Sequence, residues 1–599
     1  MKEGDVLSRC YVVRLYGLPW LAWFAPALFV SCISYTAAFF PLLCSAVWAA
    51  ICTALLSLLP QAAARLLGTL ANLLVICYAL IQAGYFCIFQ RFLWLRDVAY
   101  LRDGAEFANS VFSYLSVGFL AGAAGLLALS LLACRLRPRT QPNRLRFVLA
   151  CFGALTAAAL LSFCAPDNTR YDALGVCKAT GLYQTAAYDI SEHFMQPALC
   201  QTDAEQARAQ VSAYLNTYGS SGAANSMTGK LRGKNVILVL IESADDWTIT
   251  QDSAPTITRL MQEGIQFTNF YTPLYGSART FNSEFAMNTG IFSPTDGTLV
   301  TSYQTNDFSE SLPNQFRTSG YTANAFHYNS PSFYSRGVMD PAMGYEQYIS
   351  YMDYTNNSFS SELYEDCFVL TNPALQNKLL PTDRPFFNFV ISRNAHMPYG
   401  NGDSVGTYAL QKYPQYANCD SCSEVPYYYA KIRLLDDFFA QLLQELEQRN
   451  LLQNTVIIGV TDHYAYTMND QQRVRELSHV PVDLLVERTP CFIWSADMQP
   501  MTVSKLCNTA DLAPTLLNLF GMDCAGYLGH DIFDETYAGY AIFSDGSWIT
   551  SDAVYQNGAI AYTFPNHTIT QTEIAAMNTR TSRYLAANNQ ILSSDYYCR

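Results

Sequence analysis

Charged residues are scarce in this chain. Asp, Glu, Lys and Arg make up 14% of its 599 residues, and 49 acids against 36 bases leave a net charge of −13. Proteins that bind nucleic acid need clustered lysines and arginines to meet the phosphate backbone. The composition therefore argues against a nucleic-acid partner.

Two kinds of motif are also missing. No glycine-rich phosphate-binding loop is present, which argues against ATP as an energy source. Nine cysteines follow residue 165, but Cys419 and Cys422 have no second pair with zinc-like spacing. A structural disulfide, which is permitted outside the cell, or free thiols therefore explain them better than a zinc site. The odd count leaves at least one cysteine unpaired or paired between chains.

The charges that are present divide the chain in two. Residues 1–165 hold 12 lysines and arginines against 5 acids, a net charge of +7, so the remainder carries −20. The first part is mostly apolar from Leu18 onward and is too long for a cleaved signal peptide. A helix needs about 20 apolar residues to cross a bilayer. We predict five such helices in a membrane domain, with an interfacial amphipathic segment at 90–111. The helices lie near residues 18–38, 40–60, 67–89, 112–134 and 147–165.

Basic residues orient these helices, because loops rich in Lys and Arg stay on the cytoplasmic side. Three basic residues precede the first helix, and five arginines lie within residues 135–146. Both clusters should be cytoplasmic, so five crossings place everything after residue 165 outside the cell. Three arginines within residues 90–111 would lie on the outer side, where three nearby acids partly offset them.

The remainder is expected to be a linker or stalk at 166–230, with a helical stretch at 203–218, followed by a catalytic domain at 231–599. Continuous apolar runs, which suit strands buried on both faces of a parallel sheet, alternate there with amphipathic helices. The pattern predicts an α/β domain with a mostly parallel central sheet after the multi-pass α-helical membrane domain. The runs lie at 235–241, 322–326, 386–391 and 456–460, and the helices at 255–263, 427–448 and 511–519.

Acidic and imidazole side chains follow all four apolar runs. The carboxyl ends of parallel strands meet at the edge of the sheet where ligands bind, so these side chains should lie close together. Taken singly, each has a structural explanation as a helix cap or a core histidine, but together they indicate a site. Two carboxylates with an imidazole suit Mn²⁺ or Zn²⁺. The residues are Glu242, His327, His396, Asp462 and His463.

A hydroxyl nucleophile is available at Thr280. It lies in GSARTFNSE, residues 276–284, a turn of small residues before a helix-compatible stretch. Backbone N–H groups at a helix N-terminus favour an incoming phosphate, and a nearby divalent ion would lower the pKa of the hydroxyl. The alternative is that Thr280 only caps the helix, and the segment by itself favours that alternative.

Motifs spread over residues 233–535 resemble the lipoteichoic acid synthase family of the alkaline phosphatase and sulfatase superfamily, in which five preceding membrane helices are also typical. The matching segments are residues 234–243, 264–271, 279–285, 327–336, 394–399, 461–464 and 529–533.

The resemblance implies a role for each site residue. One Mn²⁺ ion, with Zn²⁺ or Mg²⁺ less favoured, is bound by Glu242, Thr280, Asp462 and His463, and Thr280 is also the nucleophile. Substrate contacts fall to Arg336, His396, His327 and Tyr334, and His396 is also a candidate for proton transfer. Two positions depart from the family: Tyr334 stands where relatives often have Trp, and Asn329 where some have Asp. The preferred head group and acceptor therefore stay open.

The resemblance further implies transfer of phosphoglycerol from phosphatidylglycerol to a glycolipid or a growing polyglycerol-phosphate chain. The reaction would use a covalent threonine intermediate, release diacylglycerol, and take place in an extracellular domain anchored in the cell membrane. A related phosphoglycerol or phosphoethanolamine transferase acting on another envelope glycan or lipid is the main alternative. A formylglycine sulfatase would need a C/S-x-P-x-R motif, which is missing. A catalytically silent membrane protein is disfavoured by the intact site. The primase or polymerase role and the oligomeric state stay open.

Overall fold

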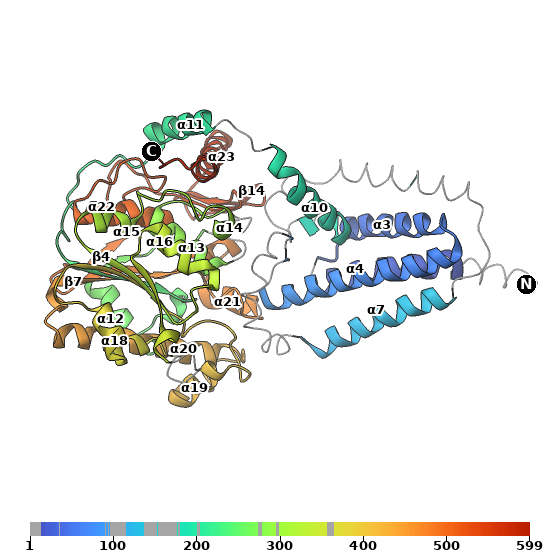
Figure 1. The fold of residues 1–599 in the computed structure, drawn as a ribbon, viewed down its shortest axis with the longest axis horizontal. Helices are drawn as coiled ribbons and strands as arrows, with labels where there is room; N and C mark the ends of the chain where they lie inside the picture. Colours follow the sequence, from blue (N-terminus) through green and yellow to red (C-terminus); the bar gives the residue numbers. More distant parts are fainter. Residues whose placement is uncertain are drawn as a thin grey trace, which may run out of the picture. The chain divides into compact units, whose positions relative to one another are not determined.

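The chain forms two compact units, one within its first 200 residues and one after them (Figure 1). Four of the five predicted membrane helices fall within the part that the structure describes. The fifth, at 147–165, and the interfacial segment at 90–111 lie almost entirely outside it. This computed structural model describes residues 13–34, 36–89, 92–93, 95, 115–136, 153, 176–177, 180–199, 204–273, 278–294, 299–355 and 365–598.

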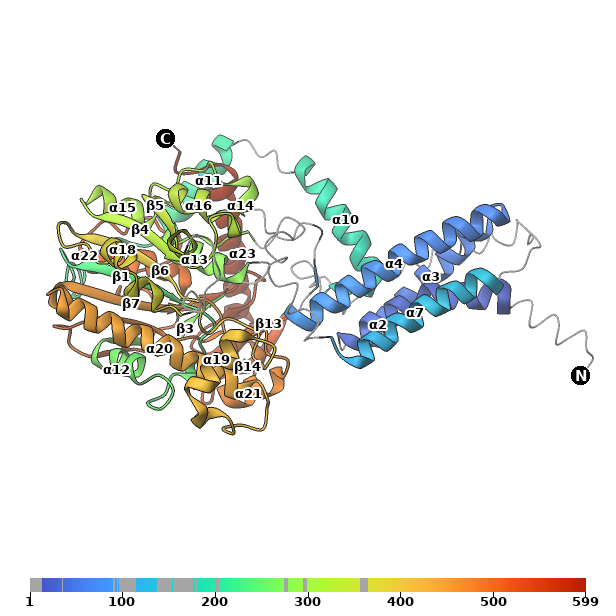
Figure 2. The same ribbon diagram turned by 60° about the horizontal axis from the view of Figure 1, so that its bottom comes forward.

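The first unit is a bundle of apolar helices. Helix α2 (Leu18–Ile33) packs against α3 (Phe39–Ser57), α4 (Gln61–Phe89) and α7 (Val117–Leu136), and α10 (Leu182–Leu199) packs on α2 and α3. Among the described residues, α3, α4 and α7 are long and apolar enough to cross a membrane, and α2 is a shorter apolar helix. The three long helices run side by side in both views (Figures 1 and 2). The predicted apolar helical domain is thus confirmed.

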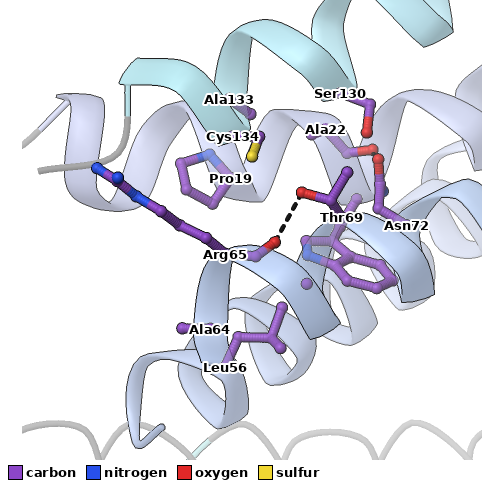
Figure 3. Close-up of a pocket in the computed structure, with 12 residues that line it drawn as sticks. Pro19, Ala22, Leu56, Ala64, Arg65, Thr69, Asn72, Ser130, Ala133 and Cys134 are labelled. Atoms are coloured by element: carbon purple, nitrogen blue, oxygen red, sulfur yellow. Dashed lines mark hydrogen bonds between the residues drawn. The ribbon is translucent and has the colours of Figure 1, made fainter. Parts of the chain in front are cut away.

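Apolar and polar side chains together line a small cavity between α2, α3, α4 and α7 (Figure 3). Its volume of about 30 Å³ has room for roughly one water molecule. The Thr69 hydroxyl donates to the carbonyl oxygen of Arg65 at 2.7 Å, and the Asn72 amide donates to that of Ala22 at 2.9 Å. These bonds stay within the bundle, as polar groups away from water require.

An eight-stranded sheet forms the centre of the second unit. Five neighbouring strands, β5, β4, β6, β1 and β7, pair in parallel. Strand β8 pairs antiparallel with both β7 and β2. The predicted, mostly parallel α/β sheet is therefore confirmed. In spatial order the strands are β5 (Gln347–Ser350), β4 (Thr322–His327), β6 (Phe386–Ile391), β1 (Asn235–Ile241), β7 (Thr455–Thr461), β8 (Cys491–Ser495), β2 (Ile265–Phe267) and β9 (Met501–Val503).

The central strands are buried on both faces. Every residue of β1 and β7 is buried. Successive side chains of a strand point to opposite faces, so β1 supplies Ile237, Val239 and Ile241 to one core. It supplies Val236 and Leu238 to the other. This two-sided burial explains why the strands read as continuous apolar runs rather than as alternating ones.

Helices cover both faces of the sheet (Figure 2). Helices α12 (Pro255–Glu263) and α20 (Val425–Gln448) contribute to one core, and α15 (Leu312–Thr318) and α22 (Leu512–Phe520) to the other. The helix predicted at 427–448 is confirmed as α20. The apolar residues on one of its faces are completely buried. These residues are Ile432, Leu435, Phe439, Leu442 and Leu446.

Residues 204–231 pack onto the second unit. Helix α11 (Ala204–Tyr218) lies against α23 (Gln571–Ser593), and the Arg208 guanidinium donates to the carbonyl oxygen of Ser594 at 3.0 Å. The backbone N–H of Ser220 donates to the carbonyl oxygen of Tyr527 at 2.9 Å. The later part of the predicted linker therefore belongs to this unit and supplies Val211 and Leu215 to one of its cores.

Candidate active site

Four neighbouring parallel strands, in the order β4, β6, β1 and β7, end at the same edge of the sheet. His327 is the last residue of β4, Glu242 follows β1, and Asp462 follows β7. His396 lies on the loop after β6. The chain direction thus delivers every predicted strand-end residue to this edge.

Glu242, Asp462 and His463 form a compact buried group. Each offers one possible ligand atom, and these atoms all lie within 4.8 Å of one another. Nε2 of His463 is 3.1 Å from Oδ2 of Asp462 and 3.7 Å from Oε1 of Glu242. A mixed set of oxygen and nitrogen atoms at this spacing suits a divalent cation.

Hydrogen bonds orient this group in a way that fits a cation. Oδ1 of Asp462 accepts from the backbone N–H groups of Ser243 and His463, both at 2.8 Å, while its buried Oδ2 receives no hydrogen bond. Nδ1 of His463 donates to the carbonyl oxygen of Tyr464 at 3.0 Å, which puts the lone pair on Nε2.

The electrostatics of the group also favour a cation. Burial, and then the neighbouring Asp462, raise the pKa of Glu242 well above its ordinary range. Burial raises the pKa of Asp462 to about 7. A divalent cation would offset this cost of keeping two buried carboxylates ionised.

Thr280 stands beside this group in the first turn of α13 (Arg279–Thr289). Its Oγ1 lies 3.3 Å from Nε2 of His463. The N-cap position belongs to Ala278, whose backbone is left-handed with φ 58°, and no side chain caps this helix. The interpretation of Thr280 as a helix cap is therefore wrong, and its hydroxyl faces the candidate metal group instead.

Arg279 anchors the start of α13. Its Nη2 donates to both carboxylate oxygens of Glu487, at 2.7 and 2.8 Å, in a pair that is almost fully buried. Its guanidinium carbon also lies 4.6 Å from the ring centre of Tyr466. Tyr466 in turn packs edge-on against the His463 ring, with 4.8 Å between centres. These contacts tie the helix that carries Thr280 to the residues around His463.

Arg336, predicted to bind the substrate, is only 1% exposed and is ion-paired. It is the first residue of α16 (Arg336–Met343), and its Nε and Nη2 donate to Oε2 of Glu284 at 3.0 and 2.9 Å. Its Nη1 makes no hydrogen bond. Burial, and then the charge of Arg336, lower the pKa of His327.

His327 and Tyr334 surround Arg336. Nδ1 of His327 donates to the carbonyl oxygen of Ile391 at 2.8 Å, and its Nε2 lies 3.3 Å from the amide nitrogen of Asn329. Tyr334 has a left-handed backbone, with φ 51°, and its ring centre lies 5.2 Å from the guanidinium carbon of Arg336. Of the two departures from the resembled family, Tyr334 therefore lies against Arg336, and Asn329 lies against His327.

His396 lies on the loop after β6, and a buried lysine clamps this loop through hydrogen bonds to its backbone. Nδ1 of His396 donates to the carbonyl oxygen of Met397 at 2.7 Å, and burial, followed by Arg393, lowers the pKa of His396 to about 4. Burial first, then Arg279 and, among the smaller causes, the His396 imidazole lower the pKa of His463.

The clamp is a buried lysine of α20. Nζ of Lys431 pairs with Asp403 at 2.6 Å and donates to the carbonyl oxygens of His396 and Pro398. Lys431 is 1% exposed, so these three acceptors provide for its charge in place of water.

Sequence reasoning missed the partners of the predicted residues, which are Glu284, Asp340, Glu487 and Lys431. A signal exists for the first two, because Glu284 follows Thr280 by one helical turn and Asp340 follows Arg336 by one turn. No comparable signal exists for Glu487 or Lys431, whose contacts come from distant segments.

Comparisons with known proteins agree with this fold. The sulfatase family matches residues 234–522. The chain is 22% identical over 492 residues to lipoteichoic acid synthase 2 of Bacillus subtilis, covering 78% of this chain and 74% of the relative. It is 23% identical over 512 residues to the lipoteichoic acid synthase-like protein YvgJ of the same organism, covering 81% of each.

A solved structure is similar as well. The crystal structure of the lipoteichoic acid synthase LtaP from Listeria monocytogenes matches with a TM-score of 0.52 and 20% identity, covering 65% of this chain and 98% of that chain. This match shows a shared fold.

Proposed function

We propose that this chain is a membrane-anchored phosphoglycerol transferase of the alkaline phosphatase and sulfatase superfamily. The match of the sulfatase family to residues 234–522 supports this proposal. It takes phosphoglycerol from phosphatidylglycerol, passes it to a glycolipid or a growing polyglycerol-phosphate chain, and releases diacylglycerol. Relatives named lipoteichoic acid synthase support this reaction. The apolar helices support it too, since the donor and the acceptor are both lipids or lipid-linked.

A single arrangement carries the proposal, namely the Thr280 hydroxyl beside two buried carboxylates and an imidazole. A threonine hydroxyl is a weak nucleophile unless a neighbouring group or a cation lowers its pKa. We propose Mn²⁺ for the position between Glu242, Thr280, Asp462 and His463. When bound, the ion would polarise a phosphoryl oxygen and lower the pKa of the hydroxyl.

The protein's own residues position the donor. His463 lies within reach of the Thr280 oxygen, and the first turn of α13 presents backbone N–H groups to a phosphate. The guanidinium of Arg336 supplies the positive charge that a phosphodiester requires. Phosphoryl transfer depends mostly on such positioning and charge stabilisation.

The reaction proceeds in two balanced steps. In the first, the Thr280 oxygen bonds to phosphorus, the bond to the diacylglycerol oxygen breaks, and the hydroxyl proton leaves with diacylglycerol. In the second, the acceptor hydroxyl attacks phosphorus, the bond to Thr280 breaks, and the acceptor proton returns to the threonine. His396 suits the proton transfer, because its donation from Nδ1 to Met397 makes Nε2 the basic nitrogen.

The test compares Thr280→Ala with wild-type protein on head-group-labelled phosphatidylglycerol. We expect the variant to lose diacylglycerol release by several orders of magnitude, because it lacks the nucleophile. Without an acceptor, the wild type should carry phosphoglycerol on Thr280, detectable by peptide mass spectrometry. The matched control is Thr570→Ala, since Thr570 does cap a helix, α23. That change should cost about 1 kcal/mol of stability and leave turnover intact.

Diacylglycerol release by Thr280→Ala at a near wild-type rate would exclude the mechanism. Preference for phosphatidylethanolamine over phosphatidylglycerol, with Thr280 still required, would instead establish the related phosphoethanolamine transferase.

A further inference from the structure

Two carboxyl groups beside Arg336 have no hydrogen-bond donor for three of their four oxygens. Oε1 of Glu284 and both carboxylate oxygens of Asp340 are buried and receive no hydrogen bond. Both side chains are completely buried. An ionised carboxylate in such surroundings is costly, because neither water nor a protein donor replaces its lost hydration.

Neighbouring hydroxyls do not fill this gap. Tyr345 donates its hydroxyl to the side-chain oxygen of Asn288 at 2.7 Å, and Tyr348 donates to the carbonyl oxygen of Asn329 at 2.8 Å. Among the described residues, the cation that pairs with Glu284 is Arg336, whose two donated bonds both go to Oε2. Two ionised carboxylates would therefore share one guanidinium, with a net charge of −1 where an anionic phosphodiester is expected to bind.

A proton between the two acids pairs two of these three oxygens and removes the excess negative charge. Burial, then the charge of Glu284, and also hydrogen bonding with Glu284 raise the pKa of Asp340 well above its ordinary range. With Asp340 neutral, its hydroxyl donates to the unpaired oxygen of Glu284. Glu284 is then held by Asp340 on one oxygen and by Arg336 on the other.

We propose that Asp340 is a neutral carboxylic acid that donates a hydrogen bond to Glu284, and that this acid pair is the positioning element for Arg336. Glu284 lies one turn after Thr280 on α13, and Asp340 lies one turn after Arg336 on α16. The pair therefore links the helix of the nucleophile to the helix of the guanidinium. The part of the proposal that concerns phosphate binding rests on the proposed function.

Two substitutions of Asp340 test whether its carboxyl group is neutral or ionised in the wild-type protein. Asp340→Asn keeps the shape and the ability to donate to Glu284, so the KM for phosphatidylglycerol should stay close to the wild-type value. Asp340→Leu keeps the approximate size but removes the donor. Its KM should rise roughly tenfold, which is the loss expected for a hydrogen bond to a charged group. Its kcat should change less, because Arg336 contacts the phosphate before and during transfer. An Asn variant as impaired as the Leu variant would overturn the proposal.

A second readout does not depend on turnover. Full-length wild-type protein in detergent at neutral pH should show the infrared carbonyl band of a protonated carboxyl group, and the difference spectrum against Asp340→Asn should isolate it. Absence of that difference band would overturn the neutral acid even if the enzyme is active. Failure of the wild type to release diacylglycerol would instead refute the proposed function and leave the infrared result to decide the acid pair.

Discussion

At the scale of single residues, polar atoms without partners mark the region around Thr280. Oδ2 of Asp462, Oε1 of Glu284 and Nη1 of Arg336 are all buried, and none takes part in a hydrogen bond. Leaving such an atom unpaired costs about 1–3 kcal/mol. Native structures retain this cost mainly where a ligand, ion or proton supplies the missing partner. We propose that the three missing partners are, in turn, the candidate cation, the shared proton and the donor phosphate.

The cation prediction belongs to this scale. Asp462→Asn keeps the shape of the side chain but removes one negative charge from the group. We expect manganese affinity to fall by roughly 100-fold or more, since even groups that only support a ligand contribute 10- to 100-fold. Elemental analysis and manganese titration of the purified full-length protein measure this. Asp497→Asn is the matched control, because Asp497 is an exposed partner of Lys234, which precedes β1 at the end opposite to Glu242. Unchanged manganese binding in Asp462→Asn would remove the proposed site.

At the scale of elements, the loop after β6 depends on α20. Lys431 reaches from this helix to Asp403 and to two loop carbonyls, including that of His396. Asp403 in turn caps α19 (Ser404–Lys412), accepting from the N–H groups of Val405 and Gly406. One buried cation therefore holds both the loop and the next helix.

Lys431→Met tests this role, because methionine fills similar space without the charge. Removing one partner of a buried ion pair costs about 3–5 kcal/mol, so the unfolding temperature should fall. Hydrogen exchange at residues 393–400 should rise, and turnover should fall as His396 loses its position. Lys412→Met is the control, since Lys412 is 35% exposed in its side chain and its pairing with Asp437 should contribute at most about 1 kcal/mol. Equal effects of the two substitutions on loop exchange would contradict the clamp.

At the scale of the whole molecule, charge and hydropathy predict the placement of the soluble unit. Its residues carry the negative charge, while the basic clusters fall within the first 146 residues of the sequence. Basic loops stay in the cytoplasm, so the second unit is proposed to lie outside the cell.

A membrane-impermeant thiol reagent tests that orientation. Cys419 is exposed on the second unit, so intact cells should yield a labelled peptide containing it, and Cys419→Ser should abolish that label. Labelling of Cys419 only after lysis would show that the unit is cytoplasmic and that the number of crossings is even.

The sequence by itself determined the features that depend on local pattern and chain direction. Apolar runs predicted the buried strands, a helical stripe predicted α20, and the acids and imidazoles after each run predicted the convergent edge. These features follow from periodicity and from the fact that parallel strands end together. Only the tertiary structure decided how the side chains pair. Arg336 pairs with Glu284, which lies 52 residues earlier in the chain, and Arg279 pairs with Glu487, which lies 208 residues later. Thr280 faces His463 and does not cap its helix. Such pairings depend on which helix faces meet in the core, where each buried polar atom takes the nearest available partner, and no local pattern specifies that partner.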